Sequence, residues 1–152
     1  MRKIIALALA AAAVSALFAG PVVAGKAKHV HDAFGASLAP FPKLAAVGDN
    51  LGMTKPGCTA GQEGVNWVGE EFTAPGNGTL RFYAEGFQGD HDIYVFQGDA
   101  VLASSEQSQL PDMAAPEEEV LLPMKKGMTV TLVACNWLGQ PDVLAHYEGV
   151  FK

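Results

Sequence analysis

The sequence predicts an all-β protein, a jelly-roll-like β-sandwich of seven or eight antiparallel strands with an irregular N-terminal arm. Three observations predict it. Short segments from Val65 onward alternate apolar and polar residues with a period of two, and turn residues recur roughly every 8–12 positions. No segment after the N-terminal apolar run has the 3.6-residue period of a long amphipathic helix.

The stretch from Thr79 to Phe96 carries the clearest alternation. Leu80, Phe82 and Ala84 fall on one face of an extended chain and the intervening residues on the other, which is typical of a half-buried strand. We expect strands with related patterns on both sides of this stretch. The predicted strands are residues 65–73, 79–87, 92–97, 101–104, 117–122, 128–135 and 143–151.

Glycine-containing turns separate these strands. Asn77-Gly78 readily takes positive φ and predicts a hairpin turn. It also begins an N-x-T glycosylation sequon, but we interpret it as a turn because the leader looks bacterial and most bacteria do not use that sequon. Gln97-Gly98-Asp99 predicts a second tight turn.

The N-terminus has the composition of a secretory leader. A basic start, Met1-Arg2-Lys3, is followed by an Ala/Leu-rich apolar run and by small residues that end at Ala24. This order predicts a signal peptide over residues 1–24 and a secreted or periplasmic bacterial protein. The alternative is a retained membrane anchor, although the apolar run of about 15 residues is shorter than the ~20 that a spanning helix needs.

The rest of the chain is acidic. After the leader is removed, 8 of the 10 basic residues and all 16 acidic residues remain, which gives a net charge of −8. Nucleic acid is excluded as a partner because its phosphates would repel such a chain. The remaining 128 of 152 residues suffice for one domain. We expect an irregular arm over 25–62, with a short helical turn near 31–38, and a β-sandwich domain over 63–152.

Cys58 and Cys135 are the only cysteines in the sequence. An exported chain matures in an oxidising compartment, which favours a disulfide between them. The alternation along residues 128–135 directs Cys135 away from the expected core, where the arm could reach it. The bridge would close a 78-residue loop and contribute roughly 4–5 kcal/mol. The alternative is two separate thiols with Cys135 buried.

One motif points to a known family. Asp90 to Val95 reads D-H-D-I-Y-V and follows an apolar strand and a Gly/Asp turn, and Gly127 to Ala134 forms a later apolar strand. This arrangement resembles the bacterial pre-peptidase C-terminal (PPC) domain, although the later strand lacks the tyrosines usual in that family. The resemblance covers about residues 63–151. It implies a jelly-roll sandwich, secretion and a non-catalytic accessory role.

Acidic residues near the turns form the first candidate site. Asp90, Asp92 and Asp99 could supply carboxylate oxygens to calcium, the one cofactor that the sequence suggests. Their spacing does not match an EF-hand loop. The alternative is that these aspartates stabilise turns by accepting hydrogen bonds from backbone N–H groups.

His29 and His31 form the second candidate site. Alternating histidines on an extended segment can chelate copper, nickel or zinc. The alternative is a flexible, solvated tail without a ligand.

Trp67 and Trp137 are the candidate ligand-binding residues. An exposed indole can lie against a sugar ring or a partner protein. The alternative is that each tryptophan fills the core or one end of the sandwich.

Motifs for nucleophilic and metal-dependent catalysis are absent from the sequence, which has no G-x-S-x-G and no H-E-x-x-H. The prediction is therefore not an enzyme but a secreted binding module for a glycan or a protein, assisted by calcium if the acidic turns bind it. The alternative is a periplasmic or secreted metal-binding protein that uses His29, His31 and the acidic turns. A third alternative is a small hydrolase, which would gather histidines and carboxylates in one cleft. The oligomeric state stays open.

Overall fold

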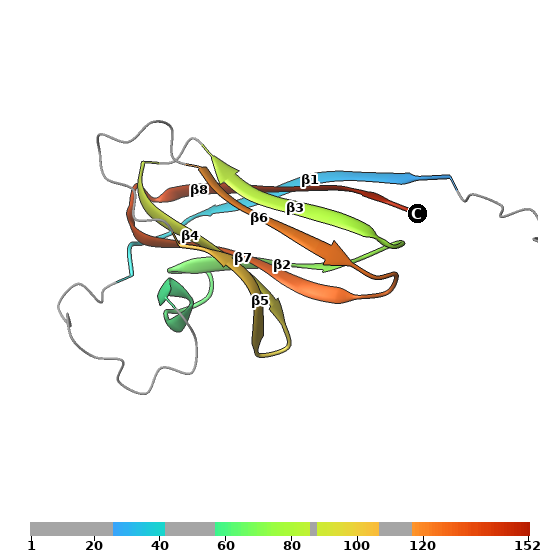
Figure 1. Cartoon of the computed structure of the whole chain (residues 1–152). Helices are drawn as coiled ribbons and strands as arrows, with labels where there is room; N and C mark the ends of the chain where they lie inside the picture. The colour runs from blue at the N-terminus through green and yellow to red at the C-terminus, as the bar shows by residue number, and fades with distance from the viewer. Residues whose placement is uncertain (1–25, 42–56, 86–87, 107–116) are drawn as a thin grey trace, which may run out of the picture.

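The computed structural model describes residues 26–41, 57–85, 88–106 and 117–152. Within these ranges the chain forms eight strands in two four-stranded antiparallel sheets that pack face to face (Figure 1). The fold is a β-sandwich, as the sequence predicts. No helix in these ranges is long and apolar enough to cross a membrane. The predicted signal peptide lies outside the described residues, as do positions 42–56 of the predicted arm.

The strand order shows how the chain is folded. Sheet A has the order β1-β8-β3-β6 and sheet B the order β2-β7-β4-β5. The first strand therefore pairs with the last, the second with the seventh, and so on inward to β4 with β5. A long antiparallel hairpin wrapped around itself gives this nesting, which is the jelly-roll topology. The bounds are β1 Lys28–Ser37, the 3-10 turn η2 Gly57–Ala60, β2 Trp67–Thr73, β3 Gly78–Glu85, β4 Gly89–Gln97, β5 Ala100–Ser105, β6 Glu117–Met124, β7 Thr129–Gly139 and β8 Asp142–Phe151.

The space between the sheets holds the main core. Leu80 and Phe82 of β3 point into it and are fully buried. Ile93 and Val95 of β4 meet them from the opposite sheet and are equally buried. Phe82 stacks on Phe34 of β1 with the ring centroids 5.9 Å apart. The two-residue alternation is confirmed for these strands, and each such side chain contributes about 1.5–3 kcal/mol by its burial.

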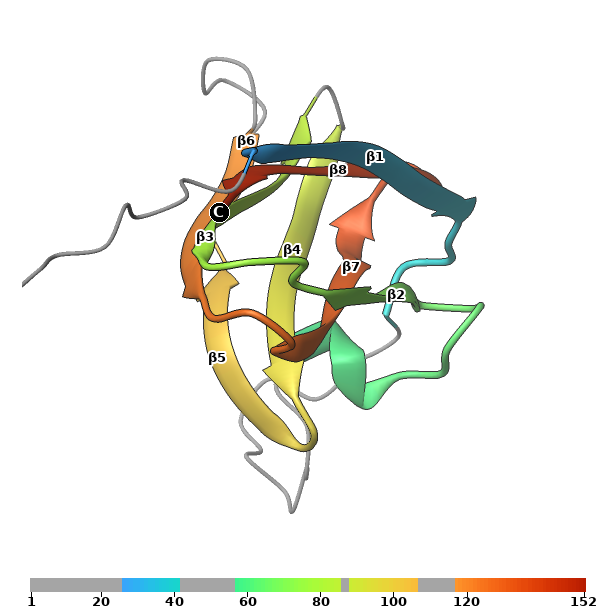
Figure 2. The same ribbon diagram turned by 90° about the vertical axis from the view of Figure 1, so that its right-hand side faces the viewer.

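β7 is buried on both faces. Val130 and Leu132 face the main core, whereas Val133 and Cys135 lie on the outer face of sheet B and are also buried. Figure 2 shows η2 lying against this outer face, beside β7. The prediction that Cys135 points away from the core is thus confirmed, but η2 shields it from solvent.

The expected irregular arm and its helical turn are wrong for residues 28–37. These residues form β1, which pairs with β8 along its whole length. Val30, Phe34 and Ala36 pack against the core, but Asp32 lies between them on this face and interrupts the apolar alternation. β8 provides the backbone hydrogen-bond partners that local sequence cannot reveal.

Most connections cross between the sheets. The predicted hairpin at Asn77-Gly78 is wrong, because β2 lies in sheet B and β3 in sheet A. Asn77 instead exchanges two backbone hydrogen bonds with Lys152, with N···O distances of 2.8 and 2.9 Å. The predicted turn at Gly98, which has φ of 59°, does join the hairpin of β4 and β5.

Candidate ligand-binding pocket

The outer face of sheet B is built by residues that alternate along its strands. Trp67, Gly69 and Glu71 occupy every second position of β2 and therefore share this face. Their cross-strand partners on β7 are, in the same order, Cys135, Val133 and Thr131. This face is therefore a mixture of aromatic, small and acidic side chains, unlike the apolar core face.

A pocket of about 650 Å³ lies on this face, within the ~300–1,000 Å³ typical of small-ligand sites. Its floor comes from β2, β7 and β4 and includes Val133 and Phe96, which are both buried. Glu63 and Trp67 line it on the side of η2, and Asp99 of the β4–β5 turn lines it as well. The pocket therefore joins segments that are far apart in the sequence.

Trp67 is held in place at the pocket. Its indole Nε1 donates a hydrogen bond to the carbonyl of Gly61 at 3.2 Å, and the ring is half-buried. A Cβ at Gly69 would lie 3.3 Å from Trp67 Cζ3 and 3.3 Å from Val133 Cγ2. A side chain at position 69 would therefore crowd the space beside the indole, and glycine leaves that part of the pocket open.

Carboxylates stand at the edge of the pocket. Glu63 precedes β2, Glu71 lies on β2 and Asp99 lies in the β4–β5 turn, and all three are exposed. The described residues that line the pocket include no lysine, arginine or histidine. The pocket thus combines an apolar and aromatic floor with a negatively charged edge.

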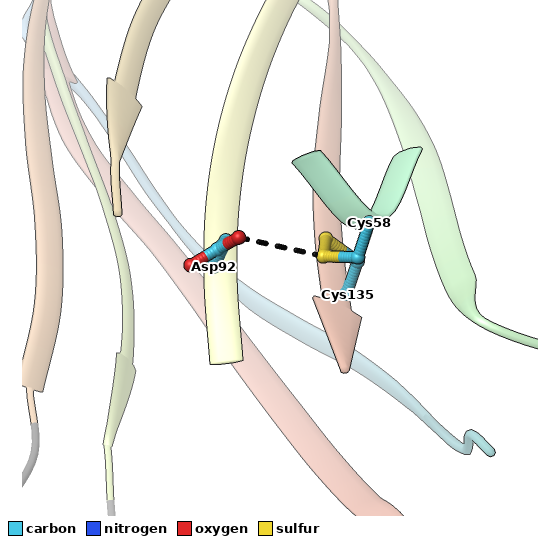
Figure 3. A group of neighbouring side chains, drawn as sticks. All are labelled: Cys58, Asp92 and Cys135. Atoms are coloured by element: carbon cyan, nitrogen blue, oxygen red, sulfur yellow. Dashed lines mark hydrogen bonds between the residues drawn. A yellow bond between two sulfur atoms is a disulfide. The ribbon is translucent and has the colours of Figure 1, made fainter. Parts of the chain in front are cut away.

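Beside the pocket, η2 is joined to β7 by the Cys58–Cys135 disulfide, whose Cα atoms are 5.9 Å apart. Both cysteines are fully buried, and the predicted bridge is confirmed. Asp92 of β4 lies against it, with Oδ2 at 3.6 Å from Cys58 Sγ (Figure 3). Tyr94 Oη donates a hydrogen bond to the same oxygen at 3.3 Å.

The surroundings of Asp92 favour its neutral form. Burial, together with the negative charges of Asp90 and Glu106, raises the pKa of Asp92 to about 7. The disulfide sulfur of Cys58 carries no proton, so a neutral Asp92 carboxyl can donate its O–H to that sulfur as a weak acceptor. Burial, followed by the charge of Asp92, raises the pKa of Tyr94 as well.

Cys58, Asp92 and Cys135 are the one group of described residues whose ligand atoms gather closely enough to hold a metal ion. The disulfide joins the two sulfurs to each other, so neither is available as a thiolate. We therefore interpret this cluster as a structural disulfide with a buried acid beside it.

The structure does not bring the three predicted calcium ligands together. Asp90 and Asp92 lie near the start of β4, whereas Asp99 lies beyond its other end. The length of extended chain between Asp92 and Asp99 corresponds to about 20 Å, while calcium binds oxygens at about 2.3–2.6 Å. Asp99 belongs to the pocket and Asp92 to the buried cluster, so one ion cannot be bound by both.

His29 and His31 lie on the outer face of sheet A. They are exposed, alternate positions of β1, so the flexible tail considered as an alternative is replaced by a strand. They line an open depression together with Arg81 and Glu148. Arg81 donates to Glu148 Oε1 at 3.2 Å and to Glu119 Oε2 at 2.7 Å, so both carboxylates are engaged.

Trp137 occupies a different place from Trp67. It lies on β7, half-buried, with its ring centroid 5.5 Å from that of Phe41. Both tryptophans pack against the buried cluster around the disulfide. Only Trp67 is among the described residues that line the pocket.

Sequence reasoning missed Glu63, Glu71 and Phe96 as pocket residues. Glu71 could have been found, because it stands four positions after Trp67 and the period of two places both on one face. Phe96 reads as an ordinary core residue, and Glu63 precedes the strand in a segment without periodicity. No local signal indicates that these two meet.

No known protein family and no curated protein matches the chain. Among solved structures, it is similar to a native family 35 carbohydrate-binding module from Clostridium thermocellum, at 12% identity and a TM-score of 0.36, over 57% of this chain and 69% of that one. It is also similar to dimeric latent PorU from Porphyromonas gingivalis, at 14% identity and a TM-score of 0.37, over 80% of this chain and 12% of that one. Neither likeness is close enough to indicate a ligand or an activity, and the PPC resemblance stays a prediction.

Proposed function

We propose that the protein is an exported, non-catalytic binding module that holds a glycan in the Trp67 pocket. The observation that carries the proposal is the pocket itself, in which a fixed indole and a buried phenyl ring are surrounded by carboxylates. Apolar C–H faces of a sugar ring pack on an aromatic ring, while its hydroxyl groups donate to carboxylate oxygens. The pocket offers both kinds of contact at once.

Binding without catalysis fits the placement of the titratable groups. The described pocket residues include no serine, cysteine or histidine. Their three carboxylates are exposed at the edge of the pocket, whereas the general acid of a glycoside hydrolase is held in an apolar enclosure. Among the described carboxylates, the pKa of Asp92 is raised to about 7 and that of Asp90 is also raised by burial. Neither residue belongs to the described pocket lining. A group with a shifted pKa is a candidate for catalysis only where a substrate can reach it.

Export is supported by two independent features. The predicted leader would direct the chain out of the cytoplasm. The disulfide is a bond that persists in oxidising compartments and is rare in reducing ones.

The first test compares the two tryptophans. We expect Trp67→Ala to weaken glycan binding at least tenfold, a loss of about 1.4 kcal/mol or more, because it removes the stacking surface. Trp137→Ala is the matched control and should stay within about twofold of wild type, since Trp137 packs on Phe41 outside the described pocket lining. Calorimetric titration with a panel of neutral, acidic and basic oligosaccharides measures both variants.

Thermal melts of the two variants establish that each is folded before its binding is compared. If the wild-type protein binds none of the oligosaccharides, the glycan proposal is contradicted. Equal losses in the two variants contradict the assignment of the site to the Trp67 pocket.

A second candidate function is transition-metal binding by His29 and His31. The observation that favours it is their placement on one side of a paired strand, which holds the two imidazoles near each other. We expect wild type to bind Cu²⁺ and His29→Ala/His31→Ala to bind it at least tenfold more weakly. His146→Ala is the control, because His146 stacks on the Tyr83 ring at 5.2 Å. Equal Cu²⁺ affinity of the double variant and wild type would remove this function.

A further inference from the structure

We propose that the Trp67 pocket selects a glycan that carries protonated amines, namely an amino sugar without N-acetylation. The inference rests on the proposed glycan function and names the class of glycan. It is drawn from the negative charge of the pocket, which a neutral sugar would not balance.

The described pocket lining is negative without compensation. Glu63, Glu71 and Asp99 contribute three carboxylates, and no basic side chain stands among the described lining residues. On sheet A, in contrast, Glu119 and Glu148 are both paired with Arg81. A neutral sugar would leave the pocket's three charges unbalanced, whereas an ammonium group would be attracted to them.

The aromatic floor supports the same choice. A cation placed over the face of a tryptophan is attracted by the ring quadrupole in addition to ordinary packing. Trp67 is half-buried and its indole is held by the hydrogen bond to Gly61, which lowers the cost of ordering this side chain when a ligand binds. An amino sugar presents an apolar ring face and a cation on one small scaffold.

The spacing of the carboxylates favours an organic cation over a bare metal ion. Glu63, Glu71 and Asp99 are not among the described groups whose ligand atoms gather within metal-binding distance of one another. They are spread around a pocket of about 650 Å³ instead. A ligand with amines on successive rings can meet separated carboxylates, whereas a metal ion needs them converged.

The expected selectivity follows from the charge pairs between ammonium groups of the ligand and carboxylates of the pocket. One exposed charge pair changes an equilibrium constant by roughly 1.4- to 5-fold, so several together give about tenfold. We therefore expect glucosamine oligomers to bind at least about tenfold more tightly than N-acetylglucosamine oligomers of the same length. The glucosamine and N-acetylglucosamine oligomers share one ring skeleton. They differ in the charge on nitrogen and in the presence of the acetyl group. Glucose oligomers, which are neutral and lack that group, control for its size.

The measurement is calorimetric titration at about pH 6, where the amines carry protons, in low and in high salt. The preference for the amine form should shrink in high salt, because exposed pairs are screened. A double variant that removes two of the pocket charges, Glu63→Gln/Glu71→Gln, should lower the affinity for the amine oligomer by about fivefold or more beyond any change in the affinity for the N-acetylated oligomer. The matched control is Glu85→Gln/Asp142→Asn, which changes net charge equally on exposed positions of sheet A and should keep the wild-type preference.

The outcomes separate this inference from the proposed function. If neutral and N-acetylated oligomers bind as tightly as the amine form, glycan binding stands and the cationic selectivity is overturned. If the control double variant loses the preference as much as the pocket variant, the selectivity arises from net charge and the pocket assignment is overturned. A lysine-rich peptide is titrated in parallel as a cationic ligand without sugar rings. If this peptide binds and no oligosaccharide does, the glycan function fails together with the inference.

Discussion

Replacing both cysteines, Cys58→Ala/Cys135→Ala, should lower the free energy of unfolding by roughly 4–5 kcal/mol. The disulfide connects residues 77 positions apart, so breaking it releases a long loop in the unfolded chain. Both sulfurs are fully buried, and their removal also leaves unfilled space under η2. Urea unfolding of the oxidised wild type and the double variant, at one pH, measures the difference.

Wild type treated with a reductant is the independent control for this prediction. Its unfolding free energy should fall to within about 1 kcal/mol of that of the double variant, because both lack the cross-link. If the free energies of unfolding of oxidised wild type and the double variant differ by less than about 1 kcal/mol, the closed loop contributes little to stability.

Asp92→Asn should stabilise the protein, and the gain should grow by about 4 kcal/mol between pH 4 and pH 8. The pKa of Asp92 is about 7 in the folded state, against 3.8 as its ordinary value. Folding therefore favours the protonated carboxyl, and this contribution is lost as pH rises from about 4 through about 7. Above that range the wild type carries a buried charge beside the disulfide, and the neutral amide of the variant does not.

Asparagine keeps an oxygen that can accept the hydrogen bond from Tyr94, so the substitution leaves the local contact intact. Urea unfolding of wild type and variant at both pH values measures the change. Asp99→Asn is the control, because Asp99 is exposed and its replacement should change stability by less than about 0.5 kcal/mol at either pH. A pH-independent difference between Asp92→Asn and wild type would contradict the burial of a charge at this position.

The strands were predictable to the extent that their alternation is local. Residues 128–135 and 143–151 read as strands and correspond to β7 and β8, since apolar residues recur at most alternate positions of both segments. β1 was missed because Asp32 breaks the alternation of its core face. The register of that strand depends on β8, more than a hundred residues later in the chain.

The pocket was predictable only in part. Trp67 was identified as a ligand-binding candidate, and Asp99 was identified for a calcium site rather than for the edge of a pocket. Asp90 and Asp92 appeared to belong with Asp99 because they are close in sequence, but an extended strand separates them. Sequence proximity is a poor guide to spatial proximity along a strand.

The amino-acid sequence by itself determined the fold class, the positions of most strands, the acidic balance and the two cysteines that form the disulfide. Each of these follows from composition or from a period of two, which neighbouring residues express without reference to the rest of the chain. Tertiary structure alone decided that β1 pairs with β8, that the Asn77-Gly78 turn crosses between sheets, and that Glu63 and Asp99 meet at the same pocket. These depend on contacts between distant segments, which form only when the two sheets close over their shared core.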